Sequence, residues 1–143
     1  MSSGRDWELI WVERSNQSVL RNVAQGVFDE AIKSDRLARY LGNPANLIVL
    51  AVRDGLVIGQ CMCVIHDHPD KETELYLDEI GTGDDWRRLG VAQSLMDAVF
   101  AKADELGIGE IWLGTEPDNV AARGLYEKTG AKGEKAIIYY LEW

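Results

Sequence analysis

The feature that most constrains the fold of this chain is a strand that turns through a glycine into a long helix. The apolar run Leu75-Tyr76-Leu77 lies in a strand expected over residues 73–80, and a helix is predicted over residues 88–106. The N–H groups at such a helix start have no intrahelical partner and carry the positive end of the helix dipole. Two arginines and small side chains within residues 87–92 therefore favour an anion there, best a phosphate. Taken alone, this segment is also compatible with an ordinary solvated helix start.

Strands and helices alternate along the chain without a repeat or a linker. We expect strands over residues 7–12, 47–53, 56–65, 73–80, 108–114 and 135–143, and helices over residues 18–32, 34–41, 88–106 and 118–129. Asp54-Gly55 indicates a two-residue hairpin turn. The order β-α-α-β-β-β-α-β-α-β predicts an α/β or α+β fold in which helices cover a mixed sheet, built as one domain over residues 1–143.

Two segments resemble the cofactor motifs of a known enzyme family. Arg-x-x-Gly-x-Ala over residues 87–92 resembles the acetyl-CoA pyrophosphate loop of the GNAT family of N-acetyltransferases. Residues 119–130, with Asn119, Ala122, Leu125-Tyr126 and Gly130, resemble the second cofactor motif, although Ala131 stands where an aromatic residue commonly follows. The resemblance covers essentially the whole chain. It implies a GNAT-like, mostly antiparallel central sheet, and residues 40–43 and 74–77 resemble the aminoglycoside 3-N-acetyltransferase branch.

The resemblance implies acetyl-CoA as the acyl donor and an amine as the acceptor. In the family, a loop holds the pyrophosphate, the end of the fourth strand pairs with the pantetheine arm, and a helix contacts the cofactor near its sulfur. The matching positions here are Arg87, Arg88, Leu89, Gly90, Val91 and Ala92; Ile80, Gly81 and Thr82; and Asn119, Ala122 and Tyr126.

Two residues are candidates for catalysis by direct attack of the amine on the thioester. The family motif places Tyr126 as the acid that protonates the departing thiolate. Alignment to the aminoglycoside branch places Glu79 at the acidic position that takes the amine proton. Adjacent strand residues point to opposite faces, so we expect only one of Asp78 and Glu79 to serve. Without the resemblance, Tyr126 is ordinary packing and Glu79 an exposed carboxylate at a strand end.

Charge and composition limit the partners. The net charge of −9 argues against a nucleic-acid partner and suits a cationic acceptor, although it also serves solubility. The longest aliphatic run, residues 47–52, is too short to cross a membrane. Residues 1–6 contain no apolar stretch of a secretory signal, and Cys61 and Cys63 form no disulfide framework. We therefore expect a cytoplasmic protein without a membrane partner.

His66-Asp67-His68 brings metal-ligand residue types together at close spacing, as Cys61-x-Cys63 also does. Because no second ligand cluster accompanies it, we expect no metal. The leading prediction is an acetyl-CoA-dependent N-acetyltransferase for a primary amine, such as a small cationic or aminoglycoside-like molecule. The alternatives are a non-catalytic acyl-CoA sensor and a protein or peptide N-acetyltransferase. A homodimer built on the β-rich C-terminus is a further hypothesis.

Overall fold

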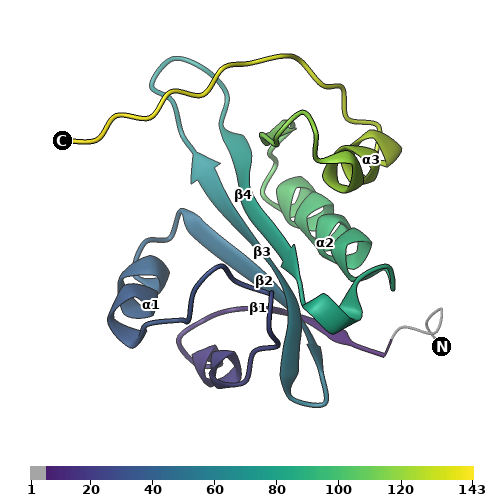
Figure 1. Ribbon diagram of the computed structural model, residues 1–143. Helices are drawn as coiled ribbons and strands as arrows, with labels where there is room; N and C mark the ends of the chain where they lie inside the picture. Colours follow the sequence, from purple (N-terminus) through teal and green to yellow (C-terminus); the bar gives the residue numbers. More distant parts are fainter. Residues whose placement is uncertain (1–5) are drawn as a thin grey trace. The chain divides into compact units, whose positions relative to one another are not determined.

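The chain divides into two compact units, Met1–Leu113 and Gly114–Trp143. The computed structural model describes residues 6–143, so residues 1–5 of the segment searched for a signal lie outside the described residues. The first unit holds β1 (Glu8–Trp11), η1 (Gln17–Arg21), α1 (Ser34–Leu41), β2 (Asn46–Arg53), β3 (Leu56–His66), β4 (Glu74–Thr82), η2 (Asp84–Trp86), α2 (Val91–Glu105) and β5 (Ile111–Trp112), and the second holds α3 (Val120–Lys128) (Figure 1). None of the described helices is long and apolar enough to span a bilayer.

The sheet of the first unit has five strands in the order β1-β2-β3-β4-β5. The first four are antiparallel, and β5 pairs parallel to β4 through two residue pairs, Leu75 with Ile111 and Tyr76 with Trp112. This confirms the mixed, mostly antiparallel sheet. Asp54 and Gly55 both have positive φ (50° and 77°), as the predicted hairpin turn between β2 and β3 requires.

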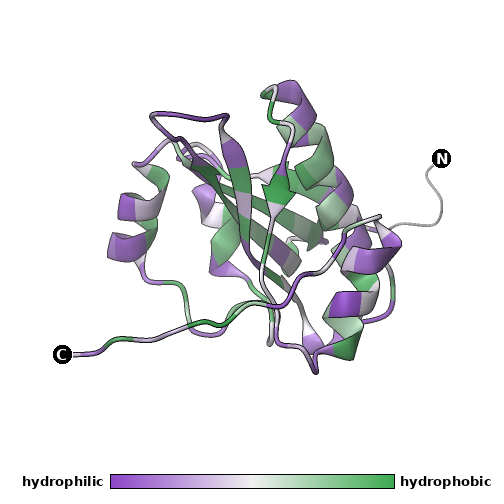
Figure 2. Cartoon of the chain, turned by 90° about the horizontal axis from the view of Figure 1, so that it is seen from above, coloured by the Kyte–Doolittle hydropathy of each residue, from purple (hydrophilic) through white to green (hydrophobic). Residues whose placement is uncertain are grey.

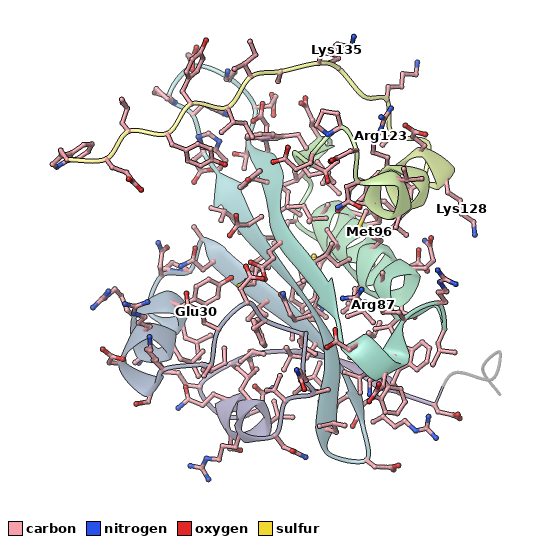
Figure 3. The ribbon with its side chains drawn as sticks, viewed as in Figure 1. Glu30, Arg87, Met96, Arg123, Lys128 and Lys135 are labelled. Carbon is pink, nitrogen blue, oxygen red and sulfur yellow. The ribbon has the colours of Figure 1, made fainter. Side chains whose placement is uncertain are left out.

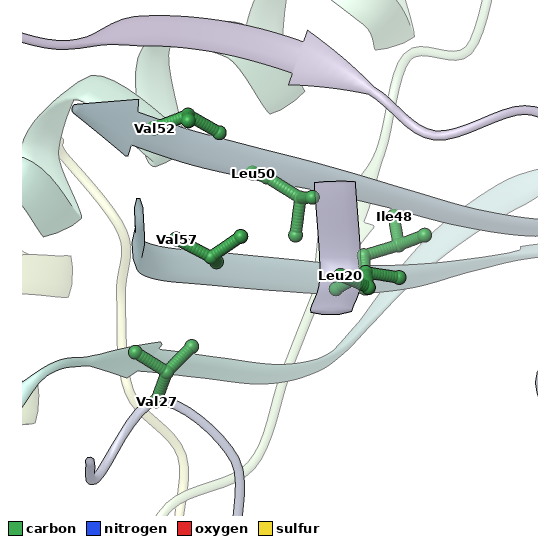
Figure 4. Packing of buried hydrophobic residues seen from close by; sticks show 6 residues of the cluster. All are labelled: Leu20, Val27, Ile48, Leu50, Val52 and Val57. Carbon is green, nitrogen blue, oxygen red and sulfur yellow. The ribbon is translucent and has the colours of Figure 1, made fainter. Parts of the chain in front are cut away.

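The two faces of the sheet are covered differently. Helix α2 covers one face, and the segment from η1 to α1 covers the other (Figures 1 and 2). Gly59 lets α2 approach closely, because a Cβ at this position would lie 2.6 Å from Val91 Cγ1. On the opposite face, a cluster of buried side chains joins the sheet to the segment around η1 (Figure 4): Leu20, Val27, Ile48, Leu50, Val52 and Val57.

The helix expected over residues 18–32 is wrong. Only η1 forms, and the chain then runs beside β3, where Val23 makes a parallel bridge with Val57 and the Ala24 N–H donates to the Val57 carbonyl (2.9 Å). A strand edge thus supplies the hydrogen-bond partners that a helix would have supplied. Leu20 and other apolar residues of the segment still reach the core, so the hydrophobic spacing was real although the helix was not.

Three other elements differ from expectation. The strand over residues 135–143 does not form, and the described residues after Gly130 contain no helix or strand. Residues 137–141 favour strands, but a strand exists only where another strand pairs with it. The strand expected over residues 108–114 is reduced to β5, and the helix expected from residue 88 begins at Val91.

Candidate active site

The loop before α2 presents free backbone donors. Arg88 and Gly90 both have positive φ (64° and 94°), and Gly90 is the N-cap of α2. In the part of the chain that the structure describes, no backbone carbonyl accepts a hydrogen bond from the N–H groups of residues 88–93. A Cβ at Gly90 would meet no atom within 4 Å, so this glycine serves the left-handed turn. Successive free N–H groups at a helix start can bind an anion, so this loop has the backbone geometry that the sequence prediction requires.

The side chains of this loop divide by exposure. Arg87 is exposed at the approach to α2, with its Nη2 3.3 Å from Asp84 Oδ1 (Figure 3). Arg88 and Leu89 are also exposed, whereas Val91 is buried against the sheet. Of the predicted cofactor-binding residues, the arginines thus offer side chains to an anion, and Val91 offers its backbone alone.

A β-bulge lies at the two candidate carboxylates of β4. Leu77 pairs with Cys63 and Glu79 pairs with Met62, so Asp78 is an extra residue between them. A bulge interrupts the alternation of side chains along a strand. The expectation that Asp78 and Glu79 lie on opposite faces assumed a regular strand, and the bulge makes that assumption wrong. Burial distinguishes them instead, because Asp78 is exposed and Glu79 is partly buried.

Glu79 has a defined polar environment. Gln60, fully buried on β3, donates from Nε2 to Glu79 Oε1 (2.9 Å) and to the Val27 carbonyl (3.2 Å). Burial raises the pKa of Glu79 most, and the negative charges of Asp29 and Asp78 raise it further, while the Gln60 hydrogen bond lowers it. A carboxylate with a raised pKa is a better proton acceptor near neutral pH.

The end of β4 has one open side. Strand β5 pairs only with Leu75 and Tyr76, so the following residues of β4 have β3 on one side and no paired strand on the other in the described chain. Ile80 and Thr82 lie here, partly buried. A Cβ at Gly81 would collide with the Val27 carbonyl oxygen, so the close approach of the chain itself requires a glycine here.

A cavity of about 830 Å³ lies in the segment from η1 to α1, which covers the face of the sheet opposite α2. Its lining combines the apolar side chains of Phe28 and Leu37 with both acidic and basic groups, among them Asp29, Glu30 and Arg14. Asp29 also acts on the carboxyl group of Glu79, which connects the cavity to the end of β4. Its size and its charged lining make the cavity a candidate site for a small polar molecule.

Two of these residues were missed by the sequence analysis. Gln60 is the only polar side chain within the run from Leu56 to Ile65, and a lone glutamine in a buried strand is a signal that could have identified it. Asp29 gave no signal, because it belongs to the segment whose helix was wrongly expected. Its relation to Glu79 depends on how that segment crosses the sheet.

In the second unit, α3 carries the other predicted contacts. Asn119 is its N-cap, and Asn119 Oδ1 accepts from the Ala122 N–H (3.1 Å). The helix that the sequence predicts from residue 118 therefore begins at Val120. Asn119 is exposed, whereas Ala122 and Tyr126 are partly buried. The side chain of Asn119 is thus engaged in capping α3.

Comparisons with known proteins agree with this geometry. The Acetyltransferase (GNAT) family model matches residues 10–131. Uncharacterized N-acetyltransferases of Mycobacterium bovis and Mycobacterium tuberculosis are 35% identical over 105 residues, 73% of this chain and 64% of each relative. The chain therefore spans less than two thirds of the length of these relatives.

Solved structures share the fold. An aminoglycoside acetyltransferase from an uncultured soil metagenomic sample, in complex with trehalose, has a TM-score of 0.80 at 14% identity, covering 96% of both chains. AAC(6')-Iy, in complex with the bisubstrate analog CoA-S-monomethyl-acetylneamine, has a TM-score of 0.79 at 20% identity, covering 97% of this chain and 99% of its own. At these identities the likeness establishes the fold. Aminoglycoside acetyltransferases are therefore among the structural neighbours of this chain. The name AAC(6')-Iy denotes a 6'-type enzyme, whereas residues 40–43 and 74–77 of this chain resemble the 3-N branch.

Proposed function

The chain belongs to the GNAT acetyltransferase family, and on that premise we propose that it transfers an acetyl group from acetyl-CoA to a primary amine. The observation that carries the proposal is the carboxyl group of Glu79, which lies at a bulge, is held by buried Gln60 and has a raised pKa. An ordinary strand-end carboxylate would be solvated and would need none of these features.

The reaction needs no enzyme nucleophile. The neutral amine attacks the thioester carbonyl carbon, the C–N bond forms, and the C–S bond then breaks to release coenzyme A. Glu79 accepts the proton that the amine loses, directly or through water, and Tyr126 donates a proton to the departing thiolate. Free N–H groups of residues 88–93 hold the pyrophosphate, and the open side of β4 at residues 80–82 pairs with the pantetheine arm.

The acceptor that fits best is a small cationic amine. The net charge of −9 favours a positively charged molecule. Asp29 and Glu30 can bind its ammonium groups, and Arg14 and Arg21 also line the cavity. Two structural neighbours are named as aminoglycoside acetyltransferases, which supports an acceptor of that kind. A protein or peptide acceptor is the less favoured alternative, because a cavity of about 830 Å³ matches the size of a small molecule.

The direct test of the activity is thiol release from acetyl-CoA in the presence of a panel of amines. The panel contains aminoglycosides, linear polyamines, a lysine peptide and monoamines of matched size that carry no second positive charge. We expect turnover with a small polyamine or aminoglycoside and none with the monoamines. If calorimetry shows acetyl-CoA binding but no member of the panel releases thiol, the protein is the acyl-CoA sensor that we keep as the alternative.

Cofactor binding by the loop is tested separately with glycine variants. Gly90→Val should weaken acetyl-CoA binding by more than tenfold, about 1.4 kcal/mol, because valine disfavours the left-handed turn that orients the N–H groups. Gly107→Val is the matched control. Gly107 lies at the other end of α2, also has positive φ (71°), and also has no atom within 4 Å of its Cβ position. Equal affinity of the two variants would remove the loop from the site.

The remaining assignments rest on the family resemblance. We propose that Asn119, Ala122 and Tyr126 contact the cofactor and that residues 1–143 act as one catalytic domain. Tyr126→Phe should retain acetyl-CoA affinity and lose turnover by about 10²-fold or more. A cytoplasmic location fits the need for acetyl-CoA and the free thiols of Cys61 and Cys63. A homodimer through the C-terminal residues stays a hypothesis for sedimentation analysis.

A further inference from the structure

A second group of polar side chains lies at the other end of β4, away from Glu79. His66 ends β3, His68 lies in the loop that follows, and Glu74 begins β4. One ligating atom from each lies within 4.8 Å of the other two. The two imidazole rings are 4.3 Å apart between centroids. The chain has two histidines, and both are in this group.

His68 and Glu74 are partly buried, whereas His66 is exposed. The side chain of His68 is 13% exposed and that of Glu74 is 20% exposed. His68 Nε2 is fully buried and lies 3.3 Å from Glu74 Oε1, yet it forms no hydrogen bond in the part of the chain that the structure describes. A buried nitrogen without a hydrogen bond costs free energy, and a bound ligand would remove that cost.

The ligand chemistry identifies what such a site would take. We propose that His66, His68 and Glu74 bind a divalent transition-metal ion, with zinc as the best fit. Two imidazole nitrogens and one carboxylate oxygen are a common zinc ligand set, in which water takes the fourth position. Magnesium and calcium prefer oxygen ligands throughout. In a tetrahedral zinc site the ligand atoms are about 3.3 Å apart, so small side-chain rotations close the present spacing.

A hydrogen bond also holds the loop that carries His68. Thr73 Oγ1 donates to Asp67 Oδ1 (2.8 Å), which closes the loop over residues 67–73. A metal held by His66, His68 and Glu74 would join both strands and the loop at one point. The sequence analysis rejected a metal because the two histidines lacked a further ligand, and the pairing of His66 with Glu74 supplies it.

The two cysteines are the competing metal ligands. Cys61 and Cys63 lie on β3 with their sulfur atoms 4.0 Å apart, and both are buried. The hydrogen bond with Cys63 and burial raise the pKa of Cys61, which opposes the thiolate that a metal requires. The histidine group is therefore the favoured site, and the spectrum of bound cobalt distinguishes the two.

The experiment titrates the full chain, freed of any histidine tag, with Zn²⁺ by calorimetry and with Co²⁺ by visible absorption. We expect one metal ion per chain, a higher melting temperature with Zn²⁺, and cobalt d–d bands without a thiolate charge-transfer band. His68→Gln and Glu74→Gln should each weaken Zn²⁺ binding at least about tenfold. Asp70→Asn removes a charge from the same loop and should leave the affinity unchanged.

Several results would overturn the proposal. These are the absence of zinc binding to the wild-type chain, equal zinc affinity in His68→Gln and Asp70→Asn, or a thiolate charge-transfer band with cobalt. Circular dichroism of each variant checks that a loss of affinity is not a loss of fold. The outcome is independent of acetyl transfer, since the metal titration requires neither acetyl-CoA nor an amine.

Discussion

The two ends of β4 each carry a glutamate, and their surroundings differ. Glu79 lies at a bulge, accepts a hydrogen bond from buried Gln60 and is close enough to Asp29 and Asp78 for their charges to raise its pKa. Glu74 lies in regular pairing with His66 and has His68 Nε2 3.3 Å from its Oε1. The two glutamates are five positions apart on the strand, roughly 15 Å.

This difference shows that the groups around a carboxylate determine whether it is suited to accept a proton or to bind a metal ion. Neighbouring negative charges and burial favour a proton on Glu79, which is the property of a general base. Neighbouring imidazole nitrogens make Glu74 one of several donors that converge on a point, which is the property of a metal ligand. Substitutions at both ends therefore test whether the two roles are separate.

The largest expected effect is at Glu79 itself. Glu79→Gln keeps the shape of the side chain and removes its charge and basicity, so kcat/KM for the amine should fall about 10²–10⁴-fold. Acetyl-CoA affinity, measured by calorimetry, should stay unchanged. Glu74→Gln is the matched control on the same strand and should keep nearly full activity. Equal losses of kcat/KM in Glu79→Gln and Glu74→Gln would indicate a general disturbance of β4 and would contradict a specific role of Glu79.

A smaller effect is expected at Gln60, which positions Glu79. Gln60→Leu removes the hydrogen bond to Glu79 Oε1, and kcat/KM should fall about tenfold. Because this bond lowers the pKa of Glu79, the acidic limb of the pH–rate profile should also move to higher pH. Thr73→Val removes a hydrogen bond at the other end of β4 and should change neither quantity. A fall in activity without a shift of the limb would indicate a packing role only.

Asp29 should have a still smaller effect, in the opposite direction on pH. Its negative charge raises the pKa of Glu79, so in Asp29→Asn the acidic limb should move to lower pH. KM for a cationic amine should rise a few-fold, since a carboxylate of the cavity is lost. Glu30→Gln changes an acidic residue next in sequence and should leave the limb in place. A limb that moves equally in both variants would point to the general charge of the cavity.

The smallest effect concerns stability. A carboxyl group whose pKa is raised in the folded state stabilises the protein below its ordinary pKa of 4.5, and that contribution is lost as the pH rises through the folded-state value. The melting temperature of Glu79→Gln should therefore rise relative to wild type as the pH increases through this range. Glu74→Gln serves as the control. A constant difference between Glu79→Gln and wild type at all pH values would contradict the raised pKa.

Local signals in the sequence predicted much of the fold. The turn at Asp54-Gly55 and the glycine-to-helix transition at Gly90 depend on residues next to each other in the chain, and both are confirmed. The helix over residues 18–32 was wrong because part of that segment pairs with β3 instead. The strand over residues 135–143 was wrong because no strand of the described chain pairs with those residues.

The site was predicted less completely for the same reason. The family resemblance proposed the loop over residues 87–92 and Glu79 as site residues. The bulge at Asp78 could not be foreseen, because it depends on the register between β3 and β4. Gln60 is 19 residues from Glu79 in sequence, and their contact follows from strand pairing. Asp29 reaches Glu79 only because its segment crosses the sheet. Contacts of this kind have no local signature.

The most direct test of the proposed role of Glu79 is the pH dependence of kcat/KM for wild type, Glu79→Gln and Asp78→Asn with the amine that the panel identifies. If Glu79 takes the amine proton, the deficit of Glu79→Gln should narrow at high pH, where more of the amine arrives deprotonated, and Asp78→Asn should follow wild type. A narrowing deficit in Asp78→Asn, with Glu79→Gln close to wild type, would contradict the account and assign the proton to Asp78.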